Sequence, residues 1–261
     1  MDPARYRLLK RNQATMRQVN NILRDEAASA IAGATGLSNQ EMGGFLRTLV
    51  PGLIDTYGNV NASAAKTYYE EQRAAWIAGY NRAPTFSASR NRSIRKGQNR
   101  AAERRASAQL RGQLYVARIP AIDVALRAEP VIGYGMSLYA KAGLDGMAPE
   151  LANAMTREVA MYNRDTLLYN STLDKSVVGV QRVAEPNACS FCQTVAFGSD
   201  GNPRVGSYAP EFHNNCNCTI ETLFEGDTVF QPDYYQDFTY GTENPDELVV
   251  TRVRSTAQTF S

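Results

Sequence analysis

The residues best suited to chemistry in this chain are four cysteines and a single histidine, and all five lie within residues 189–218. They are Cys189, Cys192, His213, Cys216 and Cys218. Cysteine thiolate and histidine imidazole are ligands that zinc prefers, and structural zinc sites commonly join two short pairs of such residues. A C-x2-C pair, twenty intervening residues and an H-x2-C pair therefore predict one Zn²⁺ ion per chain.

Tetrahedral zinc takes four ligands, so five candidates are one too many. Each two-residue spacing suits a tight turn that aims two side chains at one point. Cys216 and Cys218 stand two residues apart and point to the same side of an extended chain, where they compete for one position. The sequence favours Cys189, Cys192 and His213, and it leaves open which of Cys216 and Cys218 is the fourth ligand.

A structural zinc site fits this segment better than a catalytic one. An open catalytic site needs a general base near the metal, yet the only acid close to the second pair is Glu211, and the chain has no second histidine. The loop between the pairs is rich in glycine and proline, so its side chains pack little against one another, and a metal cross-link would stabilise it. These loop residues are Gly198, Gly201, Pro203, Gly206 and Pro210.

Two other interpretations of the cysteines are a pair of disulfides and free buried thiols. Disulfides belong to oxidising compartments. The chain opens with Met-Asp-Pro-Ala-Arg and lacks the apolar segment of a secretory signal, so we expect reduced cysteines. No apolar run approaches the length of a membrane span, and no membrane contact is expected.

Charge is separated along the chain although the net charge is only +2. Residues 221–250 carry eight acids and no lysine or arginine, whereas residues 90–105 are strongly basic. Three interpretations of the basic stretch stay open: a solvated helix or linker, contact with nucleic-acid phosphates, and docking on an acidic protein surface. The candidate nucleic-acid-binding residues are Arg90, Arg92, Arg95, Lys96, Arg100, Arg104 and Arg105.

The first half of the chain predicts helices. Apolar residues at helical spacing indicate an amphipathic helix over the first thirty residues, which Gly33 ends. Ser38 and Glu41 fit a capping box that begins a second helix, and Pro51 with Gly52 should interrupt or stop it. A third helix is expected over residues 61–80, with a core-facing stripe of Tyr69, Trp76 and Tyr80.

The second half predicts helices followed by strands. Residues 98–128 favour helix, with a break at Pro120, and the glycines of residues 131–147 indicate a loop-rich join. A long helix should run over residues 149–169. Valine-rich residues 177–183 and residues 219–224 predict two strands flanking the zinc segment.

These elements predict an α+β fold, mainly helical over the N-terminal two thirds, with a small C-terminal zinc-stapled β unit and an extended tail. We expect three parts. Residues 1–147 form a helical region that contains the basic stretch, and residues 148–225 form the long helix with the zinc-binding β unit. Residues 226–261 form an acidic, aromatic C-terminal arm.

The motifs of residues 150–225 resemble the C-terminal signature of the phage Mu F-like minor head proteins. A helix with Arg164 and Asp165 is followed by a valine-rich strand, Arg182-Val-Ala-Glu-Pro-Asn-Ala-Cys-Ser-Phe-Cys and Phe212-His-Asn-Asn-Cys-Asn-Cys-Thr-Ile. The chain is most similar to the versions in phages of actinobacteria. It departs from many members at Asn217, where they have arginine.

This resemblance implies a non-enzymatic minor capsid, or head morphogenesis, protein present in few copies per particle. Its expected partners are the phage portal protein and the major capsid protein, and some family members contact packaged double-stranded DNA. The expected location is the virion, in the head interior or at the portal vertex, and the host cytoplasm during assembly.

Two rival functions fit the sequence less well. A zinc deaminase needs H-x-E ahead of its cysteine pair, whereas His213 follows the pair here, and a metal-dependent nuclease has no motif in the chain. A zinc-containing nucleic-acid-binding adaptor should carry basic residues in its zinc unit, yet Arg204 is the only one between Cys189 and Cys218.

Overall fold

A computed structural model describes residues 3–81, 115–184, 188, 190–197, 216, 218–225 and 227. In this part of the chain the elements follow in the order α1 (Pro3–Ala32), α2 (Asn39–Asn81), α4 (Val124–Leu173), β1 (Val177–Val183), α5 (Ser190–Phe197) and β2 (Thr219–Phe224). Three long helices, the short helix α5 and one small antiparallel sheet are the regular elements of the described structure. The predicted α+β class, mainly helical, is confirmed.

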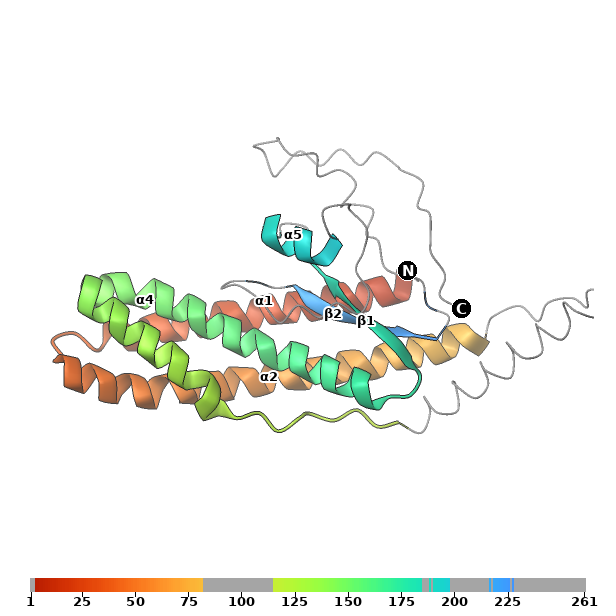
Figure 1. The fold of residues 1–261 in the computed structure, drawn as a ribbon, viewed down its shortest axis with the longest axis horizontal. Helices are drawn as coiled ribbons and strands as arrows, with labels where there is room; N and C mark the ends of the chain where they lie inside the picture. Colours follow the sequence, from red (N-terminus) through yellow and green to blue (C-terminus); the bar gives the residue numbers. More distant parts are fainter. Residues whose placement is uncertain are drawn as a thin grey trace, which may run out of the picture.

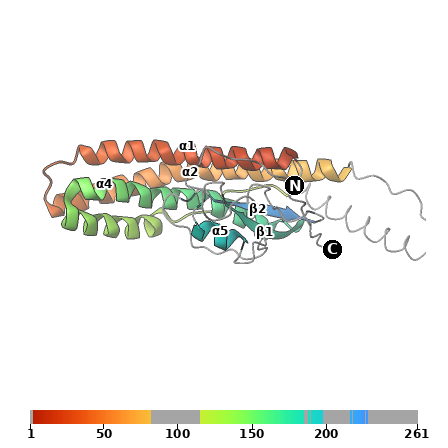
Figure 2. The same cartoon turned by 90° about the horizontal axis from the view of Figure 1, so that it is seen from above.

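The long helices pack side by side into an elongated bundle (Figure 1; Figure 2). α1 and α2 form an antiparallel hairpin through a turn in which Gly36 adopts a positive φ of 84°. α4 bends at Gly143, where φ is 66° and ψ is −164°. Figure 1 shows its first arm running to one end of the bundle and its second arm returning beside α1 and α2.

The main core lies between α1, α2 and α4. Apolar residues three or four positions apart on α1, such as Val19, Leu23 and Ala27, are buried against Leu46 and Ile54 of α2 and against α4. Residues at this spacing share one helix face, so the amphipathic pattern turns directly into a buried stripe. The helix predicted for the first thirty residues is confirmed.

The start of α2 confirms the capping box. The backbone N–H of Ser38 donates to Glu41 Oε2 at 2.8 Å, and the backbone N–H of Glu41 donates to Ser38 Oγ at 3.3 Å. These reciprocal bonds satisfy backbone donors that the first helical turn leaves unpaired. Their effect is to fix where α2 begins.

The prediction that Pro51 and Gly52 stop this helix is wrong. α2 continues through Pro51 to Asn81, so the second and third predicted helices are one. Proline removes the hydrogen bond to the carbonyl four residues earlier, here that of the exposed Arg47, which water can solvate. Burial of Val50, Leu53 and Ile54 on both sides of the proline then holds the helix together.

Two further predictions near α4 are wrong. Residues 131–147, expected as a loop-rich join, are helical except at the bend at Gly143. Residues 115–123, expected as helix, are not helical, and α4 begins only at Val124, where the Asp123 side chain accepts from the backbone N–H of Leu126 at 3.0 Å. The helix-favouring composition of residues 98–128 therefore did not make residues 115–123 helical.

The strands are confirmed, and they pair with each other. β1 and β2 are antiparallel, with Val183 opposite Thr219 and Arg182 opposite Ile220. The sheet packs on a second core that includes Tyr69 and Trp76, and the Trp76 ring stacks on Phe224 with centroids 5.1 Å apart. The predicted core role of these two aromatic residues is therefore confirmed.

Candidate metal centre

Three of the predicted ligands meet at one point. The sulfur atoms of Cys192, Cys216 and Cys218 all lie within 4.8 Å of one another, and those of Cys192 and Cys216 are 3.4 Å apart. All three side chains are buried, and none of the three is joined to another by a disulfide. Three sulfur atoms at these distances could hold a metal ion.

The pairing of β1 with β2 brings these cysteines together although they are far apart in sequence. β1 ends at Val183, opposite Thr219, the first residue of β2. Cys218 therefore enters the sheet at the same end at which the chain leaves β1 toward α5. The sequence suggested a tight turn at the first cysteine pair, whereas Cys192 lies in the first turn of α5.

Cys216 and Cys218 both face Cys192, so the structure includes each of them in the cluster. Cys189 and His213 lie outside the described residues. Three thiols are thus in place, and one further ligand would complete a tetrahedral site.

Two buried arginines border the cluster, and the sequence did not predict a role for either. Arg164 of α4 donates from Nε to the backbone carbonyl of Cys218 at 2.9 Å and from Nη2 to the carbonyl of Cys216. Arg182 of β1 donates from Nη2 to the sulfurs of Cys192 at 3.4 Å and of Cys216 at 3.8 Å. Guanidinium groups from two elements thus hold the backbone and the sulfurs of the same cluster.

Hydrogen bonds between the thiols shift their pKa values in opposite directions. The hydrogen bond between Cys192 and Cys216 holds the pKa of Cys216 well below its ordinary value, and Cys218 and the Arg164 charge act in the same direction. The same hydrogen bond raises the pKa of Cys192. The thiolate is the form of cysteine that binds metal.

The described sulfurs fit a zinc ion. Zinc–sulfur bonds of about 2.3 Å in a tetrahedron place neighbouring sulfurs about 3.8 Å apart. The 3.4 Å between Cys192 and Cys216 and the 4.8 Å limit for the whole cluster bracket this value. Small side-chain movements would bring Cys192, Cys216 and Cys218 to ligand distance.

Comparison with known proteins gives one result. A family model described as VG15 protein matches residues 4–242, which is most of the chain. The chain belongs to the VG15 protein family. No curated protein and no solved structure matches it.

Membership of the VG15 family supports a phage protein. The resemblance to the Mu F-like minor head proteins is a narrower assignment, and it stays a prediction. Among the described helices, none combines the length and the apolar character needed to cross a bilayer.

The basic stretch predicted to bind nucleic acid lies outside the described residues. The same holds for the C-terminal arm, apart from Asp227. Their predicted roles, and the division of the chain at residues 147 and 225, stay predictions.

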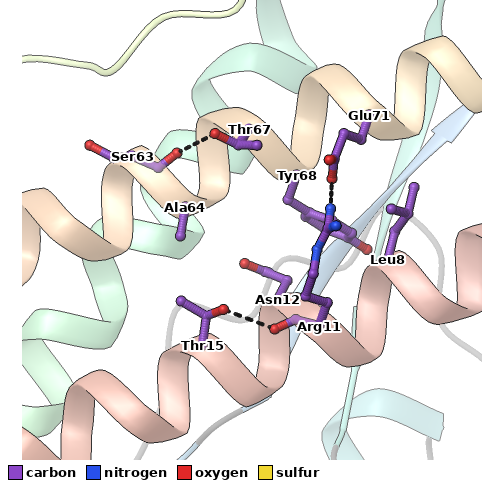
Figure 3. A pocket seen from close by; sticks show the side chains of 9 residues that line it. All are labelled: Leu8, Arg11, Asn12, Thr15, Ser63, Ala64, Thr67, Tyr68 and Glu71. Atoms are coloured by element: carbon purple, nitrogen blue, oxygen red, sulfur yellow. Dashed lines mark hydrogen bonds and ion pairs between the residues drawn. The ribbon is translucent and has the colours of Figure 1, made fainter.

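A surface groove of about 340 Å³ lies between α1 and α2 (Figure 3). Arg11 pairs with Glu71 across it, and the hydroxyls of Thr15 and Thr67 donate to backbone carbonyls one turn earlier. These polar groups serve the two helices themselves, so we assign the groove no ligand. Its lining residues are Leu8, Arg11, Asn12, Thr15, Ser63, Ala64, Thr67, Tyr68 and Glu71.

Proposed function

We propose that this phage protein is a non-enzymatic minor capsid, or head morphogenesis, protein that carries one structural Zn²⁺ ion. The observation that carries the proposal is the buried cluster of Cys192, Cys216 and Cys218, which lies where α4 packs on the two-stranded sheet. The fourth ligand comes from Cys189 or His213. Membership of a phage family over residues 4–242 and the resemblance of residues 150–225 to minor head proteins support the same conclusion.

The surroundings of the cluster support a structural rather than a catalytic metal. The described neighbours that donate to it are Arg164 and Arg182, which are permanently charged donors and cannot serve as a general base. Burial of all three thiols also suits a closed site. When bound, zinc would tie α5 and β2 together, and it would contribute folding free energy.

We place the protein in the virion, in the head interior or at the portal vertex, and in the host cytoplasm during assembly. The proposed partners are the portal protein and the major capsid protein. Packaged double-stranded DNA is a further partner through the basic stretch of residues 90–105, because seven basic side chains there can neutralise phosphates.

The test uses particles and procapsids of the phage that encodes the chain. Mass spectrometry should detect the protein in both, and chemical cross-linking should join it to the portal or major capsid protein. Its absence from particles and from procapsids would reject the proposal. Metal analysis of the purified full chain should give about one zinc per chain, and Cys192→Ser should lose it.

A further inference from the structure

Arg164 and Arg182 are the charged side chains through which two other elements contact the cysteine cluster. Arg164 has no exposed surface, and Arg182 is 4% exposed. Burying a guanidinium is costly unless acceptors surround it. At the cluster those acceptors include two cysteine carbonyls for Arg164 and two cysteine sulfurs for Arg182.

The two arginines contact the cluster in different ways. Arg164 donates hydrogen bonds to the backbone carbonyls of Cys216 and Cys218. These bonds hold the backbone of Cys216 and of Cys218 where both sulfurs lie close to that of Cys192. Arg182 instead donates from Nη2 to the sulfurs of Cys192 and Cys216 themselves.

The contact of Arg182 has a clear chemical preference. A neutral thiol is a weak acceptor, whereas a thiolate forms a charge-assisted hydrogen bond with a guanidinium. Three thiolates around one divalent ion leave a net charge of about −1 before any fourth ligand is counted. A buried cation beside two of the sulfurs offsets that charge where water cannot.

We propose that Arg182 is a positioning residue of the metal centre: its guanidinium stabilises the thiolates of Cys192 and Cys216 and thereby raises the affinity for Zn²⁺. Arg164 supports the same site by fixing the backbone of Cys216 and Cys218. This inference rests on the proposed zinc site. It makes Arg182 a determinant of metal affinity rather than only a link between β1 and the cluster.

The test measures zinc affinity of the full chain by competition with a chromophoric chelator. Arg182→Gln should weaken binding by about 10- to 100-fold, the range found when partners of metal ligands are removed. Arg182→Lys should fall between Gln and the wild type, because lysine keeps the charge but donates from a single point. Equal affinity of Arg182→Gln and the wild type would overturn the proposal.

Arg73→Gln is the matched control. Arg73 is also buried, on α2, but it pairs with Asp174 rather than with a cysteine. This change should lower the melting temperature and leave zinc affinity unchanged. If Arg73→Gln weakened zinc binding as much as Arg182→Gln, the effect would reflect general stability, and the specific role of Arg182 would be rejected.

Cobalt replaces zinc as a spectroscopic probe of the sulfurs. The wild type loaded with Co²⁺ should show thiolate charge-transfer absorption, and Arg182→Lys should shift these bands because the hydrogen bonds to sulfur change. Unchanged bands together with unchanged affinity in Arg182→Lys would count against the proposal even if Arg182→Gln fails to fold. If the wild type itself binds neither zinc nor cobalt, the proposed zinc site is rejected, and the proposed role of Arg182 is rejected with it.

Discussion

At the scale of single residues, Glu221 shows how tightly the ends of the described chain are joined. Its carboxylate has no exposed surface and accepts from Arg5 at 2.9 Å, from the Tyr68 hydroxyl and from Gln72. Arg5 also pairs with Asp227. Burial raises the pKa of Glu221, and the Arg5 charge opposes that rise. The first turn of α1, the last third of α2 and β2 therefore meet at one buried carboxylate.

Glu221→Gln should lower the free energy of unfolding by about 2–3 kcal/mol, because it removes a buried charge that satisfies Arg5. The loss stays below that of an isolated buried pair because Arg5 keeps Asp227. Urea unfolding at neutral pH measures it. The control is Glu71→Gln, which breaks the exposed pair with Arg11 and should cost less than about 1 kcal/mol. Equal losses would contradict this ranking.

Residue type alone located part of the candidate site. Cys192, Cys216 and Cys218 could be identified because cysteine is rare in the chain and metal ligands have characteristic spacing. Arg164 and Arg182 could not be assigned, because a single arginine in a helix or strand pattern is usually exposed. Their burial depends on the register between β1 and β2 and on the packing of α4, neither of which local sequence specifies.

At the scale of elements, the bend in α4 depends on one glycine. Gly143 has φ 66° and ψ −164°, a combination that is essentially confined to glycine. The glycines of residues 131–147 predicted a join, and a join exists, but it occupies a single residue. Helical residues on both sides are held by buried contacts such as Val131 and Met147, which composition does not reveal.

Gly143→Ala should destabilise the protein by about 1–3 kcal/mol, because alanine is strained in this conformation although there is space for its Cβ. Gly133→Ala is the matched control in the same helix. Gly133 is exposed, helical and open on its Cβ side, so alanine there should stabilise by up to about 1 kcal/mol. Denaturant unfolding of both variants decides the point, and effects of the same sign would show that Gly143 does not set the bend.

At the scale of the whole molecule, the described chain has three buried clusters of unequal size. The large core between α1, α2 and α4 and the aromatic core under the sheet contain long side chains. The third cluster holds only small residues, which are Ala184, Cys192, Ala196, Cys216 and Cys218. Little apolar area is buried there, so hydrophobic burial contributes least where the proposed metal would contribute most.

Metal removal should therefore loosen one end of the molecule before the other. Hydrogen exchange of the zinc-loaded chain, repeated after chelation, should accelerate in α5, β2 and the turn of α4 around Arg164. Amides near Leu46 and Leu151 should keep their protection, since the helical core does not depend on the cysteines.

Cys192→Ser is the control for this experiment. It should exchange like the chelated wild type, and chelation should then change nothing further, because the variant has already lost a ligand. Faster exchange throughout the chain would mean that the metal stabilises the whole fold as one cooperative unit. If chelation leaves hydrogen exchange of the wild type unchanged, Arg164, Arg182 and the β1–β2 sheet hold the cluster without a metal. That result would contradict a structural role for zinc.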